Sequence, residues 1–212
     1  MITLYFLRHG QTDFSRDNAF CGAGTNAVLT ADGAAMAAGF ARAYSKFQFK
    51  AVYCSPMTRA RQTAALFSES AGISPLFRDG LREIEYGDWE GKNVSEVVQQ
   101  YGEAHRLWNA DPVSFGPTAG ETAAAVRDRV IGVIEEIKAA VAEGPVLLVS
   151  HKATIRIAVC ELIGIDLNLF RKSLDCPTAS VTTVELRKSG PMLTSLADRS
   201  HLDQKLRNLP GT

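Results

Sequence analysis

The chain has 212 residues, 46% of them hydrophobic, which is enough for one substantial core and predicts a single domain over residues 1–212. Its 23 basic and 23 acidic residues give a formal net charge of zero, so the broad positive field that binds nucleic acid or an anionic membrane is not expected. The four cysteines lie far apart, the apolar start is too short for a signal peptide, and no run approaches the ~20 apolar residues of a membrane span, so we expect a cytoplasmic protein with reduced thiols.

The predicted elements alternate between strands and helices along the chain. Apolar runs predict strands over residues 2–7, 51–54, 76–77 and 146–149, followed by a hairpin-like pair over 180–186 and 192–196. Helices are predicted over 30–47, 55–70, 94–108 (as one or two helices), 126–141 and 153–162. This order predicts an α/β fold with three layers: a mixed, mostly parallel sheet, helices on both faces, and a small helical cap at about 82–120.

Two predicted strands end at a histidine. The first strand stops at Arg8 and His9, and the strand before residue 150 stops at His151. Because ligands of an open α/β sheet lie outside the carboxyl ends of the strands, we expect these side chains to meet. A single histidine at a strand end is usually structural or exposed, but the pair indicates phosphate chemistry.

An arginine follows a third predicted strand. Ser55 can cap and Pro56 can open a helix after residues 51–54, which places Arg59 in or near its first turn, where an anion is favoured. If the three strand ends converge, the pocket holds His9, His151, Arg8 and Arg59. Such a pocket suits a phosphoryl group.

Four segments of the chain carry a resemblance to a known family. They are Leu7-Arg8-His9-Gly10-Gln11-Thr12, Ser55-Pro56-Met57-Thr58-Arg59-Ala60-Arg61-Gln62-Thr63-Ala64, Glu83-Ile84-Glu85-Tyr86-Gly87-Asp88-Trp89-Glu90-Gly91 and Ser150-His151. In this order and spacing they resemble the histidine phosphatase superfamily, also called phosphoglycerate mutase-like. The resemblance implies the fold of that family and a phosphohistidine intermediate on His9.

Phosphoryl transfer to histidine needs a neutral imidazole with one bare ring nitrogen, while the other nitrogen donates its hydrogen to a fixed acceptor. By the resemblance His9 is the nucleophile. Arg8 and Arg59 would clamp the equatorial oxygens, and His151 would add a further donor. With this much fixed positive charge no metal or other cofactor is required, and no residues have metal-ligand spacing.

The departing alcohol needs a proton, and the same group must later take a proton from water, which calls for a carboxylic acid. The run over residues 81–91 resembles the acid-bearing segment of the family, with Glu83 at the matching place. Glu85 is the nearer rival. A structural interpretation, in which Glu83 is an ion-pair partner of Arg82 or another arginine, stays open.

Several residues after the nucleophile are candidates for binding substrate. Gln11 and Thr12 could offer amide, hydroxyl and backbone donors, or could serve ordinary turn chemistry. Ser15 stands where many family members carry an asparagine, and Cys21-Gly22 stands where the mutases tend to show threonine before glycine. Ser15 could still donate one hydrogen bond, and Cys21 is expected in the pocket wall.

Two later residues complete the candidate set. Lys152, next to His151, is either a phosphate ligand or a surface residue. The runs Cys176-Pro177-Thr178-Ala179-Ser180 and Arg199-Ser200-His201-Leu202 resemble the metal-independent phosphoserine phosphatase branch. By that likeness His201 reaches the pocket and recognises the carboxylate of the substrate, and an exposed tail position is the structural alternative.

The sequence therefore predicts a metal-independent phosphomonoesterase that hydrolyses a small phosphorylated metabolite, phosphoserine-like substrates being favoured. Hydrolysis is favoured over phosphoglycerate mutation because a mutase needs a longer enclosing insert. α-Ribazole phosphate and sugar phosphate phosphatases of the same superfamily remain alternatives, as does a non-catalytic phosphate-binding regulator. We expect no nucleic acid or membrane partner, and the sequence leaves the oligomeric state open, a homodimer included.

Overall fold

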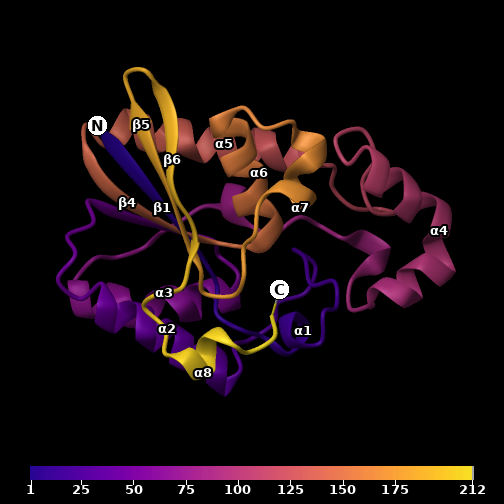
Figure 1. Ribbon diagram of the computed structural model, residues 1–212, viewed down its shortest axis with the longest axis horizontal. Coiled ribbons are helices and arrows are strands. Elements are labelled where there is room, and N and C mark those ends of the chain that lie inside the picture. The colour runs from indigo at the N-terminus through magenta and orange to yellow at the C-terminus, as the bar shows by residue number, and fades with distance from the viewer. Residues whose placement is uncertain (212) are drawn as a thin grey trace.

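The computed structural model describes residues 1–211 and contains a six-stranded sheet in the order β3-β2-β4-β1-β5-β6 (Figure 1). The strands are β1 (Ile2–Arg8), β2 (Ala51–Cys54), β3 (Leu76–Phe77), β4 (Gly144–Ser150), β5 (Val181–Arg187) and β6 (Gly190–Asp198). β1, β2, β3 and β4 run parallel, whereas β5 is antiparallel to both β1 and β6. The prediction of a mixed, mostly parallel sheet is confirmed.

Helices cover both faces of this sheet. They are α1 (Asp13–Arg16), α2 (Ala31–Ala43), α3 (Thr58–Ala71), α4 (Val94–Ala110), α5 (Ala123–Ala140), α6 (Lys152–Ile163), α7 (Phe170–Ser173) and α8 (Gln204–Arg207), with short 3-10 turns at Asp79–Leu81, Gly87–Trp89 and Leu167–Leu169. α5 and α6 lie on one side of the sheet, and α2 and α3 lie on the other (Figure 1). The predicted three-layer α/β architecture is therefore confirmed.

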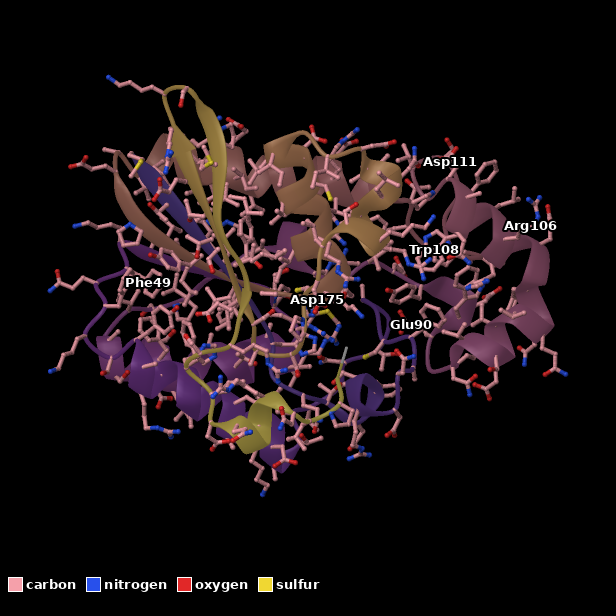
Figure 2. The ribbon with its side chains drawn as sticks, viewed as in Figure 1. Phe49, Glu90, Arg106, Trp108, Asp111 and Asp175 are labelled. Carbon is pink, nitrogen blue, oxygen red and sulfur yellow. The ribbon has the colours of Figure 1, made fainter. Side chains whose placement is uncertain are left out.

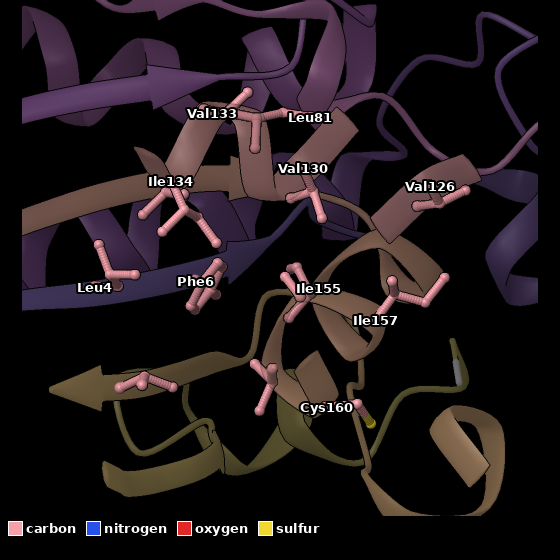
Figure 3. Close-up of a cluster of buried hydrophobic side chains, with 14 of the residues drawn as sticks. Leu4, Phe6, Leu81, Val126, Val130, Val133, Ile134, Ile155, Ile157 and Cys160 are labelled. Carbon is pink, nitrogen blue, oxygen red and sulfur yellow. The ribbon is translucent and has the colours of Figure 1, made fainter. Parts of the chain in front are cut away.

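The alternation of side chains along β1 supplies both halves of the core. Leu4 and Phe6 pack against Val130 and Ile134 of α5 and against Ile155 of α6 (Figure 3). Leu7 points to the opposite face and belongs to the cluster formed with α2 and α3. Because successive residues of a strand face opposite sides, one buried strand serves both layers and carries its end into the centre of the molecule.

The segment that contains α4 lies beyond the end of the sheet (Figure 1). It has an apolar cluster of its own, in which Trp89, Val97 and Trp108 are buried. In Figure 2 Trp108 lies between α4 and the rest of the protein, and Arg106 points outward from the far side of the helix. α4 is a single helix in hydrogen-bonding terms but bends at Tyr101, whose φ of −132° is not helical.

Two predicted helix boundaries are wrong. α3 begins at Thr58 with Met57 as its N-cap, not at Ser55, because the backbone is still extended at Met57 and the Ser55 hydroxyl contacts His151 instead of capping the helix. α2 starts after Thr30, which caps it by accepting from the Gly33 N–H as predicted, but it ends at Ala43 rather than at residue 47. Arg59 still falls in the first turn of α3.

Within residues 1–211, the helices are all too short or too polar to cross a lipid bilayer. The four cysteines are free thiols, and three of them, Cys54, Cys160 and Cys176, are buried.

Candidate active site

The loop that follows β1 places His9 at the centre of the molecule. The His9 N–H donates to the Ser150 carbonyl at 3.0 Å, which ties the end of β1 to the end of β4. The next residue must be glycine, because a Cβ on Gly10 would lie 2.4 Å from the carbonyl oxygen of Gly33 in α2. The loop that carries His9 and the first turn of α2 thus pack backbone against backbone.

The His9 imidazole is held in the tautomer that a nucleophile needs. Its Nδ1 donates to the Gly10 carbonyl oxygen at 2.7 Å, so Nε2 is left without a hydrogen. Burial, together with the positive charges of Arg59 and Arg8, lowers the pKa of His9 well below its ordinary value. The ring is therefore neutral at physiological pH, with the Nε2 lone pair available.

His151 lies beside His9, with ring centroids 5.1 Å apart. Its Nδ1 accepts a hydrogen bond from Arg59 Nε at 3.1 Å, so its Nε2 carries the hydrogen and donates to Ser55 Oγ at 2.8 Å. Burial and the charge of Arg59 lower the pKa of His151. The sequence predicted that His151 donates to the phosphoryl group, but in this structure both ring nitrogens have protein partners, and the ring orients Arg59.

Arg59 is otherwise fixed by backbone carbonyls of the loop before α2. Its Nη1 donates to Thr25 O at 2.9 Å, and its Nη2 donates to Cys21 O and Gly22 O at 3.2 Å each. With the bond to His151, four of the five guanidinium hydrogens have acceptors, which leaves one Nη1 hydrogen for a ligand.

Glu90 fastens the loop that holds Arg59, and sequence reasoning missed this role. Its carboxylate accepts from the Gly22 N–H at 2.9 Å and from Thr25 Oγ1 at 2.7 Å. The approach requires a glycine, because a Cβ on Gly22 would lie 2.2 Å from the Ile84 carbonyl oxygen. The expectation that Gly22 binds substrate is wrong for its N–H, because this N–H donates its hydrogen to the Glu90 carboxylate.

Arg8 is held by the C-terminal part of the chain. Its Nη1 donates to Cys176 O at 2.7 Å and to Gly211 O at 2.9 Å, while its buried Nε has no partner among residues 1–211. Burial lowers the pKa of Arg8. Buried donors are nearly always satisfied, so this Nε–H is a candidate donor to an acceptor atom of a ligand.

Gln11 does not face the pocket. Its Nε2 donates to Pro210 O at 2.6 Å and its Oε1 accepts from Thr30 Oγ1 at 3.0 Å. The prediction that its amide contacts phosphate is therefore wrong. The reason is that the segment around Pro210 packs against the loop that follows β1. No local sequence pattern near Gln11 indicates this contact.

The Glu83 carboxylate lies at the N-terminal end of α6 and shares the cavity with Arg8 and Arg59. Its Oε1 accepts from Ile84 N at 3.0 Å and from Thr154 N at 3.2 Å and Oγ1 at 3.3 Å. Its Oε2 accepts a single bond, from Ala153 N at 3.2 Å. Glu83 is 5% exposed and lines the cavity, whereas Glu85 is exposed and does not. Of the two carboxylates considered from the sequence, Glu83 is the one in position.

Arg129 of α5 positions the segment that carries Glu83. Its guanidinium donates to the carbonyls of Gly80 at 2.9 Å, Arg82 at 2.7 Å and Glu83 at 3.0 Å. An ion pair with Glu121 at 3.0 Å compensates its charge. The Glu83 carboxylate itself accepts from the backbone N–H groups of Ile84, Ala153 and Thr154. The structural interpretation in which Glu83 is an ion-pair partner of Arg82 is therefore wrong.

A cavity of about 390 Å³ opens in front of His9. The sequence-predicted residues that line it are Arg8, His9, Thr12, Ser15, Cys21, Arg59, Glu83 and Lys152. Lining residues that the sequence did not single out as site residues include Asn18, Tyr86, Trp108, Asn109, Arg156, Arg171 and Lys172. Arg156 had a detectable signal, because it lies one helical turn after Lys152 and so shares its face of α6.

Thr12 and Ser15 line the cavity while forming the cap of α1. Thr12 Oγ1 accepts from Ser15 N at 3.2 Å, and Ser15 Oγ accepts from Thr12 N at 2.9 Å. Turn chemistry and cavity lining therefore coexist at these two positions. Nearby Asn18 lines the same wall with a φ of 52°, a backbone conformation that asparagine tolerates better than most residues.

His201 does not reach the cavity. Its ring packs edge-on against Phe40 and Tyr44 of α2, with centroids 5.7 and 6.2 Å away. The prediction that it recognises a substrate carboxylate is wrong for this structure, because the connection from β6 to α8 carries the ring over the aromatic face of α2. Burial among these rings lowers its pKa.

No three or more His, Cys, Asp or Glu side chains gather into a metal-binding group anywhere in residues 1–211. The chemical groups of the cavity are two guanidinium donors beside a bare imidazole nitrogen, a carboxylate opposite them, and an outer wall of further cations. This set can accept a phosphoryl group, spread its charge and exchange a proton with its oxygen.

Comparisons with known proteins agree with this arrangement. The model of the histidine phosphatase superfamily (branch 1) matches residues 4–199. Phosphoserine phosphatase 1 of Hydrogenobacter thermophilus is 28% identical over 204 residues, which cover 96% of each chain. Among solved structures, YhfR of Bacillus stearothermophilus is similar with a TM-score of 0.86 at 26% identity, over 96% of this chain and 100% of that one. A mycobacterial glucosyl-3-phosphoglycerate phosphatase solved with VO3 has a TM-score of 0.83 at 26% identity, over 92% and 98% of the two chains. By its motifs, its fold and the match along nearly its whole length, the chain belongs to the histidine phosphatase superfamily.

Proposed function

We propose that this protein is a metal-independent phosphomonoesterase that hydrolyses a small phosphorylated metabolite, phosphoserine-like substrates being favoured, through a phosphohistidine on His9. The observation that carries the proposal is the bare Nε2 of a neutral His9 in a cavity that also holds Arg8, Arg59 and Glu83. A protein that only bound phosphate would not need a carboxylate opposite the nucleophile.

In the first step the Nε2 lone pair of His9 forms a bond to phosphorus while the bond from phosphorus to the ester oxygen breaks. Glu83 Oε2, which accepts only one hydrogen bond from the protein, carries the proton that the leaving oxygen takes. The alcohol departs, and His9 holds the phosphoryl group. The bond from His9 Nδ1 to the Gly10 carbonyl supports the positive charge that develops on the ring.

In the second step a water molecule attacks the same phosphorus atom from the side that the alcohol has left. Glu83, now a carboxylate, takes the proton of that water, the bond between nitrogen and phosphorus breaks, and inorganic phosphate forms. Arg8, through its free Nε edge, and Arg59, through its remaining Nη1 hydrogen, stabilise the charge on the equatorial oxygens in both steps. Fixed guanidinium charge thus supplies the stabilisation that a metal ion supplies in other phosphatases.

His151 and Glu90 act as positioning residues in this proposal. His151 aligns Arg59 through its Nε and stays uncharged, so it adds no repulsion to the cationic site. Glu90 holds the loop whose carbonyls fix the other side of the same guanidinium. Misplacing a positioning group by about 1 Å can cost on the order of 100-fold in rate.

The substrate class is proposed from two supports. The similarity to phosphoserine phosphatase 1 of Hydrogenobacter thermophilus extends over nearly the whole chain. The cavity, at about 390 Å³, suits a small metabolite. The partner in this proposal is a small phosphorylated molecule and not nucleic acid or membrane, and the four free thiols support a reducing, cytoplasmic setting.

The test is hydrolysis of p-nitrophenyl phosphate in the presence of a chelator. We expect activity that survives chelation, is blocked by vanadate and falls by at least about 10⁴-fold in His9→Ala. The matched control is His201→Ala, which removes a half-buried imidazole outside the cavity and is expected to keep activity within about twofold.

Rapid quenching with a radiolabelled substrate should trap an acid-labile phosphoryl group on the protein, and the label should be missing in His9→Ala. Tight binding of phosphate esters by the unaltered protein without turnover would contradict the proposal and favour a regulator. Interconversion of phosphoglycerates faster than phosphate release would instead identify a mutase.

A further inference from the structure

The outer wall of the cavity carries more positive charge than the proposed reaction uses. Among residues 1–211, six cationic side chains and one carboxylate side chain line the cavity. Two of the six, Arg8 and Arg59, flank His9. The other four belong to α6 and α7 and take no part in the two steps of hydrolysis: Lys152, Arg156, Arg171 and Lys172.

The charge balance of the cavity favours an additional anion. A bound phosphate monoester contributes about two negative charges at neutral pH. Glu83 carries a proton at this stage of the proposed reaction, so about four of the six positive charges have no counterpart on the phosphoryl group. The chain as a whole has a formal net charge of zero, so this excess is local to the cavity.

Lys152 and Arg156 are held close together without strong partners from the protein. They are one turn apart on α6 and therefore project from the same face. The Lys152 ammonium has no acceptor among residues 1–211, and burial together with the charges of Arg8 and Arg156 lowers its pKa to about 8. The buried Nε of Arg156 has no partner within the described part of the chain, and its Nη2 lies 3.6 Å from Asp175, whose side chain is 67% exposed. Such an exposed carboxylate compensates a cation weakly.

Arg171 brings a third cation to the same wall from α7. Its guanidinium carbon lies 3.8 Å from the centroid of the Trp108 ring, and its Nη1 donates to Asn109 Oδ1. Both partners are neutral, so they orient Arg171 but do not compensate its positive charge. Burial and the charge of Arg156 lower its pKa, as expected for neighbouring cations that share no counterion.

We infer that Lys152, Arg156 and Arg171 bind a second anionic group of the substrate, with Lys172 at the exposed rim of the same wall. The substrate is then a small phosphate monoester whose alcohol part carries a carboxylate or another phosphate. This inference rests on the proposed function and extends it. It also replaces His201, which lies outside the cavity, as the recognition site for such a group.

The experiment compares pairs of substrates that differ only in the second anion. 3-Phosphoglycerate and glycerol 1-phosphate share a carbon skeleton, but the second has a hydroxymethyl group in place of the carboxylate. Fructose 1,6-bisphosphate and fructose 6-phosphate form the corresponding pair for a second phosphate. We expect kcat/KM to be at least about tenfold higher for the more anionic member of at least one pair, and the pair that shows it identifies the anion.

The variants Arg171→Gln and Arg156→Gln test the assignment of the wall. Each should lower kcat/KM for the more anionic substrate about tenfold more than for the counterpart that lacks the second anion, mainly through KM, and raised salt should reduce the preference of the unaltered protein. Lys138→Gln is the matched control, because it removes one exposed positive charge at the end of α5 and should leave both substrates unaffected.

The outcomes separate this inference from the proposed function. Hydrolysis that depends on His9 but proceeds within about twofold for both members of each pair would overturn the second anion site and leave the phosphatase intact. An equal loss on both substrates in Arg171→Gln and Arg156→Gln would also overturn it. Absence of hydrolysis of every substrate by the unaltered protein would overturn the proposed function itself.

Discussion

The inner part of the cavity, around His9, Arg8 and Arg59, differs from the outer wall, formed by Lys152, Arg156, Arg171 and Lys172, in how its polar groups are hydrogen-bonded. Around His9 most polar hydrogens have a fixed acceptor: the His9 Nδ1 on a carbonyl, the His151 Nε2 on Ser55, and four of five hydrogens of Arg59 on the protein. The exception is the buried Nε of Arg8, which has no partner within residues 1–211. On the outer wall, Lys152 and the Nε of Arg156 lack acceptors within residues 1–211. The inner part is therefore organised before a substrate arrives, and the outer part is completed by the substrate.

This difference separates chemistry from selection. Preorganised donors cost no rearrangement when charge develops, which favours the reaction of any bound phosphate. Cations with few protein partners discriminate between substrates, because the binding free energy that they contribute depends on whether the substrate carries an anionic group for them. Changes to the inner part should thus affect substrates with the same kind of leaving group alike, whether or not they carry a second anion. Changes to the outer wall should instead change the ranking between substrates with and without that anion.

The most severe test of the inner part after His9 itself is Glu83→Gln. An amide keeps the size of the side chain but cannot give a proton to the leaving oxygen, so we expect kcat/KM for an alkyl phosphate to fall by about 10²–10⁴-fold. p-Nitrophenyl phosphate has a leaving group that needs no proton, and its kcat/KM should fall less than about tenfold. An equal loss on both substrates would contradict the assignment of Glu83 as the acid.

The loop that holds Arg59 gives the next largest effect. Glu90→Ala removes the acceptor of Gly22 N and Thr25 Oγ1, so the free energy of unfolding should fall by about 1–3 kcal/mol in urea titrations. kcat/KM should fall about tenfold on every substrate, because Arg59 loses its alignment. Glu103→Ala is the control, since Glu103 pairs only with Arg106 on the surface of α4. A change in substrate ranking in Glu90→Ala would break the separation of the two parts.

The buried imidazoles make stability depend on pH. His9 and His151 have lowered pKa values in the folded protein. Below about pH 6.5 both imidazoles are therefore protonated in the unfolded chain while they stay neutral in the folded one. The free energy of unfolding should therefore fall as the pH drops below about 6.5, by about 1.4 kcal/mol per pH unit for each imidazole, and this contribution should be constant above about pH 7.5. Urea titrations from pH 5 to 8 measure it, and His9→Gln should reduce the slope; an unchanged slope would show that His9 is not kept neutral by burial.

Local patterns were sufficient for most of the fold and for the centre of the site. The apolar runs of β1, β2 and β4 each end where the chain leaves the sheet, and parallel strands bring such ends together, so His9 and Arg59 could be placed near each other from sequence alone. The start of α3 was misjudged because Ser55 and Pro56 carry a strong capping signal, while the contact from Ser55 to His151 spans 96 residues and has no local signature.

The remaining features depend on contacts between distant segments. Arg8 and Gln11 donate to carbonyls around Pro210 and Gly211, and Glu90 reaches back to Gly22, so neither the loss of Gln11 from the site nor the role of Glu90 could be deduced from neighbours in the sequence. Arg171 enters the cavity because of its packing on Trp108, which only the tertiary structure defines.

Main-chain oxygens, and not carboxylates, hold Arg8, and they hold most of Arg59 as well. Carbonyl dipoles fix the direction of a guanidinium but do not neutralise its charge, so these two guanidinium groups are expected to attract any tetrahedral oxyanion. The orthophosphate released in the proposed reaction is one such ion. We therefore expect orthophosphate to inhibit the proposed hydrolysis, and the same ion should raise the unfolding temperature in proportion to the logarithm of its concentration once the site is saturated.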